Sequence, residues 1–444
     1  MDIAGDQSEP ADAQIGIPVV PWSLGKRVAF RLCFAYFTLF CLSNQVFSGI
    51  FIIPKVDIPD FGTLWPLRQI TFWTAAHVFR VTHPLVYTGS GSGDKTFDWV
   101  QAFCLLLFAV IATGVWSIFD RRRQNYVALY KWFRVGIRFA LASEMFLYGF
   151  DKLIPLQMPF PFLTKLVEPF GNFSPMGVLW YSIGASRSYE ICTGCAEVLG
   201  GILLLVPRIT TLGALVCLFD TTYVFILNMT YDVPVKLFAF HLILFSLYLL
   251  APDARRLSSF FFASRETPPP QHPQLFRKPR ANRIAVALQV AFGLYLVAMN
   301  LYGGIKAWHT YGGARPKPEL YGIWNVEEMS VDGQIRAPLL TDYDRWRRIL
   351  FDFPTNTTFQ RMDDTFTGYT SSINASDKTL TLTRSSDKNW KATFTYERPA
   401  QDQLVLDGSM SGHKIYMRLK LVDRSKLILV NRGFHWINEF PYQR

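Results

Sequence analysis

The chain has 444 residues, of which 50% are hydrophobic and 16% aromatic, while only 18% are charged. Ordinary soluble domains carry roughly 25% charged residues, so this balance excludes a plain soluble globule. The net charge is +11, and basic residues gather at the ends of apolar blocks, as in Arg121-Arg122-Arg123. The positive-inside rule of membrane proteins explains this placement, and no basic array interleaved with aromatics indicates nucleic-acid binding. We therefore expect the lipid bilayer to be the main partner, with no nucleic acid.

The first stretch, residues 1–24, is polar, partly acidic and contains proline. We expect it to be disordered and cytoplasmic. The apolar block that follows lacks the short basic flank and the small-residue cleavage site of a signal peptide. This block is therefore expected to stay in the protein as a membrane anchor.

Seven apolar segments have about the length of membrane-crossing helices. A hydrocarbon core of about 30 Å needs about 20 apolar residues in a helix. The segments are Val28–Ile50, Phe97–Phe119, Ala128–Phe150, Tyr189–Val206, Leu212–Met229, Val235–Leu250 and Ile284–Leu301. They predict a mainly α polytopic membrane protein with about seven transmembrane helices.

The loops between these segments predict their direction, because loops rich in Lys and Arg stay in the cytoplasm. Basic residues lie before the first span, between the second and third, between the fourth and fifth, and between the sixth and seventh. All these places fall on one side if each span crosses once. We therefore expect a multi-pass protein of the inner (plasma) membrane with a cytoplasmic N-terminus and an extracytoplasmic C-terminal domain.

Three loops have a distinctive composition. Leu64–Arg80 and Pro175–Ile183, on the predicted outer side, are aromatic in the manner of segments at the membrane interface. Surface helices are one interpretation of them, and re-entrant segments that line a site are the other. On the inner side, residues 263–283 are basic and proline-rich, which predicts a flexible cytoplasmic linker.

From Tyr321 onward, polar and apolar residues alternate with period two, which predicts strands. The expected strands are Thr379–Thr383, Lys391–Tyr396, Gln403–Leu406, Lys414–Leu421 and Lys426–Val430. Turn residues such as Asp407-Gly408 and Ser411-Gly412 separate them. Residues 321–444 are therefore expected to form an all-β extracytoplasmic domain, either a barrel or a sandwich.

Two segments of this tail have a different pattern. Tyr343–Phe351, which contains Trp346, predicts a short amphipathic helix. The aromatic ending Gly433–Ile437 predicts a core strand, with the wall of a pocket as the alternative.

Ionisable side chains are costly inside a membrane, so they tend to face the interior of a helix bundle. Glu144, Glu197, Asp220 and His241 lie seven to nine residues from the outer ends of their spans. That places them about 10–15 Å below the outer surface, at about 1.5 Å per residue. They are the candidate catalytic residues of one outer-facing polar pocket. A network that only locks helices together would have the same pattern, so both interpretations stay open.

Further polar residues of the same spans are candidates for contact with a bound cofactor: Tyr148, Lys152, Glu190, Asn228 and Lys236. Lys236 lies about 140° around its helix from His241, so it need not share the pocket. A quinone is one candidate cofactor. No second ligand stands at metal-site spacing from His435, and we expect no metal.

Cys192 and Cys195 form a CxxC pair at the outer start of the fourth span. A helix N-terminus stabilises a thiolate, so a redox pair on the oxidising side of the membrane is one interpretation. Two buried small residues are the other, because the predicted outer loops and tail hold no second cysteine pair for a thiol relay. Both cysteines are also predicted to point away from the helix face of Glu197.

Three motifs resemble the DoxX-like membrane family. Arg138–Asp151, with Arg-Phe at its start and Tyr-Gly-Phe-Asp at its end, is similar to the first helix of that family, and Glu197–Leu204 and Asn228–Lys236 strengthen the likeness. The resemblance covers the third to sixth spans and implies a four-helix membrane bundle, which we assign to residues 128–262.

The remaining segments are similar to longer bacterial proteins of this type. Residues 25–127 hold two spans and a long outer loop that includes Gly91-Ser92-Gly93-Asp94. The seventh span is expected at 284–305, ahead of the tail at 321–444.

The resemblance implies a role beside membrane oxidoreductases, because DoxX-like proteins are similar to subunits of such systems, including a thiosulfate:quinone oxidoreductase. The first expectation is therefore an accessory or quinone-linked subunit of a redox complex. The second is a non-enzymatic carrier of a lipid or small molecule, or an assembly factor that presents the β domain. The third is a thiol oxidoreductase that uses Cys192 and Cys195. The family has no universal catalytic signature and fold does not imply function, so enzymatic activity stays open.

Overall fold

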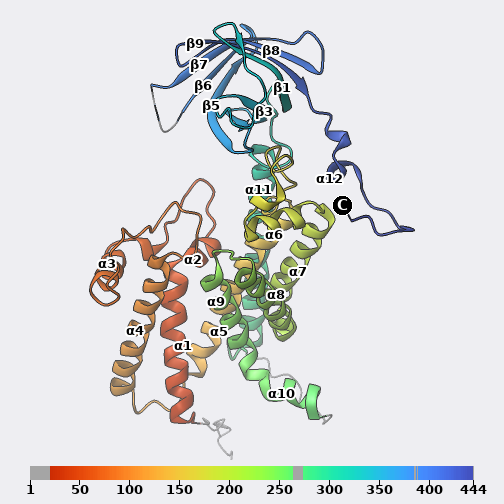
Figure 1. The fold of residues 1–444 in the computed structure, drawn as a ribbon. Helices are drawn as coiled ribbons and strands as arrows, with labels where there is room; N and C mark the ends of the chain where they lie inside the picture. The colour runs from red at the N-terminus through yellow and green to blue at the C-terminus, as the bar shows by residue number, and fades with distance from the viewer. Residues whose placement is uncertain (1–20, 264–273, 385–386, 388, 444) are drawn as a thin grey trace, which may run out of the picture. The chain divides into compact units, whose positions relative to one another are not determined.

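The computed structural model describes residues 21–263, 274–384, 387 and 389–443 (Figure 1). Most of the predicted N-terminal stretch, and residues 264–273 of the predicted linker, lie outside the described residues. The chain divides into two compact units. The first comprises Met1–Met145, Leu199–Asn228 and Pro234–Leu296, and the second comprises Phe146–Val198, Met229–Val233 and Val297–Arg444.

Each of the seven predicted spans is helical. The first is divided at Asn44, whose side chain accepts a hydrogen bond from the Val46 amide at 3.0 Å. The helices are α1 (Leu24–Ser43), α2 (Gln45–Ile50), α4 (Thr96–Phe119), α5 (Val127–Leu153), α7 (Arg187–Leu205), α8 (Thr210–Thr230), α9 (Lys236–Leu250) and α11 (Pro279–Thr310).

Among the described residues, five helical segments are long and apolar enough to cross a membrane. They are Thr96–Phe119, Arg187–Leu205, Pro207–Thr230, Lys236–Ala263 and Pro279–Thr310. The mainly α, membrane-embedded character of this part of the chain is therefore confirmed, while the count of seven spans stays a prediction.

The helices α1 and α5 are not among these five, and both carry several charged residues. In α1, Arg31 is almost fully buried, and its guanidinium donates to the Ser117 hydroxyl at 2.7 Å, the Asp120 carbonyl at 3.0 Å and the Tyr126 hydroxyl at 2.6 Å. These acceptors lie at the end of α4 and in the turn that follows. The buried charge is satisfied there and fastens α1 to α4.

Shorter helices occupy the loops. The two aromatic loops predicted on the outer side contain α3 (Leu67–His77) and α6 (Pro175–Gly184), so a helix forms in each. In the first, Trp65 and Trp73 are exposed. The other short helices are α10 (Ala254–Ser258) and α12 (Ile428–Asn431).

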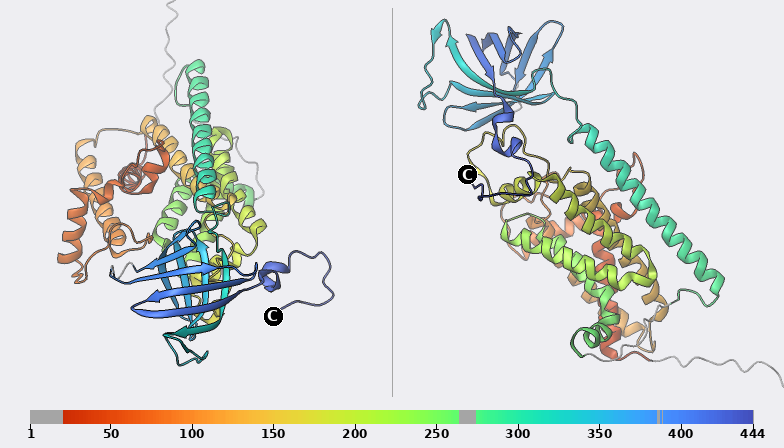
Figure 2. Two further views of the ribbon diagram at one scale, coloured as in Figure 1. Left: turned by 90° about the horizontal axis from the view of Figure 1, so that it is seen from above. Right: turned by 90° about the vertical axis from the view of Figure 1, so that its right-hand side faces the viewer.

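The β domain is an antiparallel barrel in the second unit, so the barrel rather than the sandwich is confirmed (Figure 2). Its strands are β1 (Gly322–Val331), β2 (Gln334–Ile335), β3 (Trp346–Phe353), β4 (Asn356–Arg361), β5 (Phe366–Asn374), β6 (Thr379–Thr383), β7 (Lys391–Glu397), β8 (Gln403–Met410) and β9 (His413–Leu421). β2 is a short addition to the end of β1. Pairing of β1 with β9, from Trp324–Leu421 to Val331–Ile415, closes the sheet.

The barrel interior is filled by side chains. Alternation is clearest in β7, where Ala392, Phe394 and Tyr396 are buried and the residues between them are exposed. The inward residues of all the long strands form one apolar core that includes Trp324, Phe351, Phe359, Leu406 and Met417. A closed barrel of this size has an interior that side chains can fill.

The turn prediction was right at one place and wrong at another. Ser411 and Gly412 form the two-residue connection between β8 and β9, and their φ angles are 51° and 85°. A two-residue hairpin turn of type I′ requires positive φ at both of these positions. Asp407-Gly408 is not a turn, because β8 continues through it to Met410. Gly408 is needed there for another reason: its α-carbon faces the backbone of Thr393 and Phe394 on β7.

Three further predictions for the tail were wrong. The expected helix Tyr343–Phe351 is largely strand β3. This strand lacks a period-two pattern because both of its faces are buried. Ile349 lies in the barrel core, and Leu350 packs against the segment around Leu163. The expected strand Lys426–Val430 and the expected core strand Gly433–Ile437 do not form. The pairing of β1 with β9 leaves no free barrel edge for them.

We predict that Gly408→Ala destabilises the barrel while Gly368→Ala does not. An added Cβ at Gly408 would lie 2.1 Å from the Thr393 carbonyl oxygen, whereas at Gly368 its nearest neighbour is Asn356 Oδ1 at 3.9 Å. Overpacking of this kind costs about 1–3 kcal/mol. Thermal unfolding of the full chain, followed by circular dichroism of the β domain, measures the difference. Equal midpoints for the two variants would contradict the prediction.

Candidate functional site

Glu144 and His241, both in the first unit, bind different helices. Glu144 of α5 is fully buried and accepts a hydrogen bond from the Gln45 amide of α2 at 2.8 Å. His241 of α9 lies 2.7 Å from the Tyr36 hydroxyl of α1 through Nε2 and 2.7 Å from the Leu237 carbonyl through Nδ1. A carbonyl can only accept, so Nδ1 carries the proton and Tyr36 donates to Nε2. Both ring nitrogens of the histidine are thereby satisfied.

The N-terminus of α9 is capped by a residue that the sequence analysis missed. Asp94, in the loop before α4, accepts hydrogen bonds from the backbone amides of Lys236 at 2.7 Å and Leu237 at 2.9 Å. The Lys236 ammonium lies 3.8 Å from the same carboxylate. Carboxylates stabilise helix N-termini, so Asp94 fastens a distant loop to α9. The signal in the sequence was an acidic residue directly after a run of glycine and serine.

Glu197 and Glu190 serve the second unit. Glu197 of α7 forms an ion pair with Lys152 of α5 at 2.5 Å, and both side chains are buried. Glu190, two turns earlier on α7, is also buried and accepts a hydrogen bond from the Met158 amide at 2.9 Å. One carboxylate thus holds two helices together, and the other holds the loop that follows α5.

The remaining predicted residues are placed as follows. Asp220 is half-buried near the middle of α8, and Asn228, near the end of α8, is buried with its amide 3.5 Å from the Val235 carbonyl. Tyr148 has the Lys152 ammonium 5.9 Å from its ring centre. Cys192 and Cys195 are exposed thiols on α7, not joined in a disulfide. They therefore lie away from the buried Glu197, as expected, and are not the buried small residues of the alternative interpretation.

Hydrogen bonds to separate helices are therefore the common feature of the predicted site. Glu144 is bound by α2, His241 by α1, and Glu197 by α5. Contacts of this kind are typical of a network that locks helices together. The proposed common pocket stays a prediction. In the part of the chain that the structure describes, no group of three or more His, Cys, Asp or Glu residues is arranged to hold a metal ion.

The loop between α5 and α6, residues 154–174, is docked on the barrel within the second unit. Asp352 of β3 accepts the Leu163 amide at 2.8 Å and forms an ion pair with Arg315 at 2.6 Å. The Arg315 guanidinium also lies 4.3 Å from the centre of the Phe353 ring. Buried apolar contacts complete the joint, formed by Leu163, Ile323 and Leu350. A buried carboxylate with two polar partners thus fixes one end of the barrel to this loop.

The other end of the barrel is a mouth with a cavity of about 510 Å³. β3 runs from Trp346 at this mouth to Asp352 at the docked end. The lining includes basic, aromatic and sulfur-containing side chains and one acid: Arg336, Tyr343, Asp344, Trp346, Arg361, Tyr369, Arg384, Trp390, Met410 and His413. This mouth is the candidate binding site of the β domain, because it is concave and lined by both aromatic rings and charged groups.

A row of contacting aromatic rings runs from the barrel core to the mouth. Trp346 stacks on Phe359 with ring centres 3.8 Å apart, Phe359 contacts Tyr369 at 4.8 Å, and Tyr369 contacts Trp390 at 4.8 Å. The row ends at Arg384, whose guanidinium lies 5.2 Å from the Tyr369 ring and 4.9 Å from the Trp390 ring. Cation–π contacts of this kind hold a guanidinium in place without neutralising it.

The charge of the mouth is positive. Arg336 is paired with Asp342 at 3.3 Å and Asp344 at 3.8 Å. Arg384 donates to the Tyr369 hydroxyl at 3.0 Å, a neutral partner. On the rim, His413 contacts Asp332 at 2.7 Å, and this hydrogen bond lowers the pKa of the Asp332 carboxyl. The Arg384 guanidinium is thus bonded to a neutral partner and lies next to two aromatic rings.

Comparison with known proteins gives a partial match. No family model matches the chain, and no solved structure matches it. Among curated proteins, the chain is similar to "Uncharacterized protein YwoB" of Bacillus subtilis (strain 168), with 30% identity over 124 residues. The aligned region is 28% of this chain and 79% of the relative.

We predict that replacing Glu197 alone lowers the stability of the protein more than replacing both Lys152 and Glu197. Glu197→Leu leaves the Lys152 ammonium buried without its partner, which costs about 3–5 kcal/mol, whereas Lys152→Met combined with Glu197→Leu restores most of the stability. Thermal unfolding of the full chain in detergent measures both. Lys165→Met, which removes a more exposed pair with Glu168, is the matched control and should change little. A double variant no more stable than Glu197→Leu would contradict the prediction.

We predict that Asp352→Ala frees the loop 154–174 from the barrel. The change leaves the Arg315 guanidinium and the Leu163 amide without their acceptor, at a cost of about 3 kcal/mol or more. Hydrogen exchange of the full chain should show faster exchange of the loop amides. Glu327→Ala is the control, because its pair with Arg418 is exposed and worth about 1 kcal/mol or less. Unchanged loop protection in Asp352→Ala would show that the carboxylate does not hold the joint.

Proposed function

We propose that this chain, which belongs to the same family as the Bacillus protein YwoB, is a DoxX-like integral membrane protein that acts as a membrane-anchored binding subunit. Its apolar helices hold it in the bilayer. Its barrel binds, at the mouth, a small molecule that combines a flat apolar body with an acidic group. The barrel lies on the extracytoplasmic side of an inner membrane, as the positive-inside rule indicates.

The single observation that carries this proposal is Arg384 at the end of the aromatic row. The mouth residues Trp346 and Tyr369 also belong to the buried barrel core, whereas Arg384 lines the mouth without belonging to that core. Among the described residues, the hydrogen bond of the Arg384 side chain goes to the neutral Tyr369 hydroxyl. A guanidinium presents five donors and prefers a carboxylate or phosphate that accepts two of them. Trp390, the partly exposed ring of the aromatic row, supplies stacking area for a flat ligand.

The docked end of the barrel supports the same function. The joint of Asp352 with Leu163 and Arg315 is buried, so the barrel is presented in a defined orientation to the loop after α5. A rigid support keeps a binding mouth in its productive geometry. This fits the carrier or assembly role among the expected functions, since the carboxylates of the helices are engaged in holding segments together.

The redox role implied by the resemblance stays a second candidate. One observation favours it: Cys192 and Cys195 are both exposed on α7, as a reactive pair must be. A link to a quinone or to subunits of a redox complex remains part of this candidate, and loss of function in a double Cys→Ser variant is its test.

We predict that the mouth binds an acidic aromatic probe through Arg384. With the full chain in lipid nanodiscs, isothermal titration calorimetry should show 1-naphthoate binding about ten-fold more tightly than the neutral 1-naphthamide, because a charge-assisted hydrogen bond contributes about 1.5–3 kcal/mol. Arg384→Ala should remove this difference.

Arg398→Ala is the matched control for that experiment. Arg398 also lies over an aromatic ring, that of Trp324 at 5.6 Å, but it is not among the residues that line the mouth. Its loss should leave the naphthoate affinity unchanged. Equal affinities of naphthoate and naphthamide, or an unchanged affinity in Arg384→Ala, would refute the proposal.

A further inference from the structure

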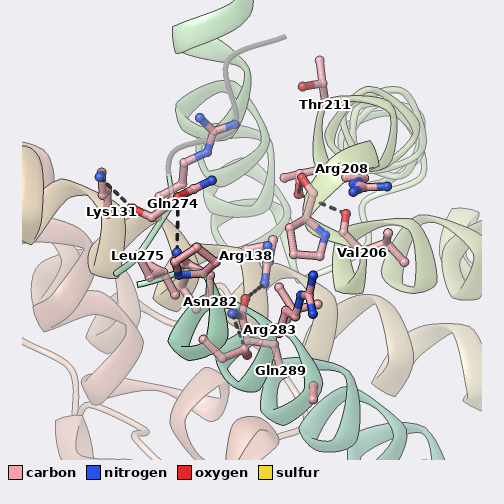
Figure 3. A pocket seen from close by; sticks show the side chains of 18 of the residues that line it. Lys131, Arg138, Val206, Arg208, Thr211, Gln274, Leu275, Asn282, Arg283 and Gln289 are labelled. Atoms are coloured by element: carbon pink, nitrogen blue, oxygen red, sulfur yellow. Dashed lines mark hydrogen bonds between the residues drawn. The ribbon is translucent and has the colours of Figure 1, made fainter. Parts of the chain in front are cut away.

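A second cavity, of about 840 Å³, lies within the first unit, among α5, the turn between α7 and α8, and the start of α11 (Figure 3). Figure 3 shows Lys131, Arg138, Arg208 and Arg283 around it. With Arg134, five basic residues line the cavity, against the single acid Asp253. The rest of the lining is largely apolar, with valine, alanine and leucine side chains.

The basic residues of α5 form a stripe. Lys131, Arg134 and Arg138 are three and four residues apart, so they lie on one face of the helix. The stripe spans about 10 Å along the helix axis, at about 1.5 Å per residue. Lys131 and Arg134 are half-buried and Arg138 is buried. The positive charge therefore continues from the end of the helix into the apolar part of the unit.

Arg138 is the residue that points to a ligand. It is only 6% exposed, and it donates one hydrogen bond to the Gln289 side chain of α11. Its Nε atom is buried and has no hydrogen-bond partner among the described residues. A buried guanidinium with an unmet donor and no paired carboxylate is unfavourable for the fold. An acidic ligand in the cavity that this side chain lines would supply the missing acceptor.

The other polar groups of the cavity do not neutralise this charge. Asp253 accepts the Thr211 hydroxyl at 2.6 Å and lies 3.7 Å from Arg256, so it is already engaged. Arg134 donates to the Leu249 carbonyl at 3.1 Å and Lys131 to the Gln274 carbonyl at 2.7 Å. These carbonyls hold the two cations in place and leave their charges uncompensated.

We infer that this cavity binds the phosphate group of an anionic amphiphile. The phosphate is held by Arg138 and Arg283, and the chain of the amphiphile lies against the apolar wall that includes Val135 and Val286. Arginine binds phosphate with paired donors, and basic pockets between membrane helices on the cytoplasmic side recognise anionic lipid headgroups. The inference is independent of the function proposed for the barrel mouth.

The test uses the full chain in nanodiscs of phosphatidylcholine, with or without phosphatidylglycerol, and native mass spectrometry of the lipid that stays bound. The wild type should retain phosphatidylglycerol in preference to phosphatidylcholine. Arg138→Gln should reduce that retention about ten-fold. Because Arg138 is buried and its loss could affect folding, Arg208→Gln combined with Arg283→Gln is the second variant. Both side chains are exposed, and the same loss is expected.

Arg122→Gln is the matched control, an exposed basic residue in the turn before α5 that does not line the cavity. Its retention of phosphatidylglycerol should equal that of the wild type. Inorganic phosphate separates the two sources of the ligand chemistry. Stabilisation by millimolar phosphate without preference for phosphatidylglycerol assigns the site to a soluble phosphate. No response to either probe, or equal retention in wild type and the double variant, would overturn the inference.

Discussion

A polar side chain inside an apolar helix bundle needs a partner on another segment, because neither lipid nor apolar side chains can replace the water that it has lost. This constraint explains most polar positions of the helices. Arg31 is satisfied by the end of α4, His241 by Tyr36, and Glu197 by Lys152. The residues that resemble a catalytic set in the sequence are therefore also the residues that hold helices in place, and burial by itself does not tell the two roles apart.

The β domain meets a related constraint by closure. An open sheet leaves a row of unpaired backbone groups along each edge, and the pairing of β1 with β9 removes both edges. The interior is filled by apolar side chains, so polar contacts with other segments or with ligands form at the two ends of the barrel. One end is docked on the loop after α5 through Asp352, and the other is open and lined by arginines and rings.

The two proposed ligand sites share one criterion. At each, an arginine is held in place by neutral groups while its charge stays uncompensated: Arg384 by the rings of Tyr369 and Trp390, and Arg138 by Gln289. Neutral partners alone do not mark a ligand site, since the buried guanidinium of Arg31 is also held by hydroxyls and a carbonyl and serves the fold. Arg384 and Arg138 differ from Arg31 in that each also lines a cavity.

The sequence by itself determined where the long helices and the strands β6 to β9 lie, because apolar length and period-two alternation are local properties of the chain. It failed at β3, where the loop 154–174 covers the outer face of the strand and removes the alternation, and at Gly408, whose neighbour is the backbone of another strand. Only the tertiary structure decided the partners, such as Asp94 with α9 and Asp352 with Leu163. These pairs join residues far apart in the chain, and no local pattern records which distant donor a buried carboxylate will meet.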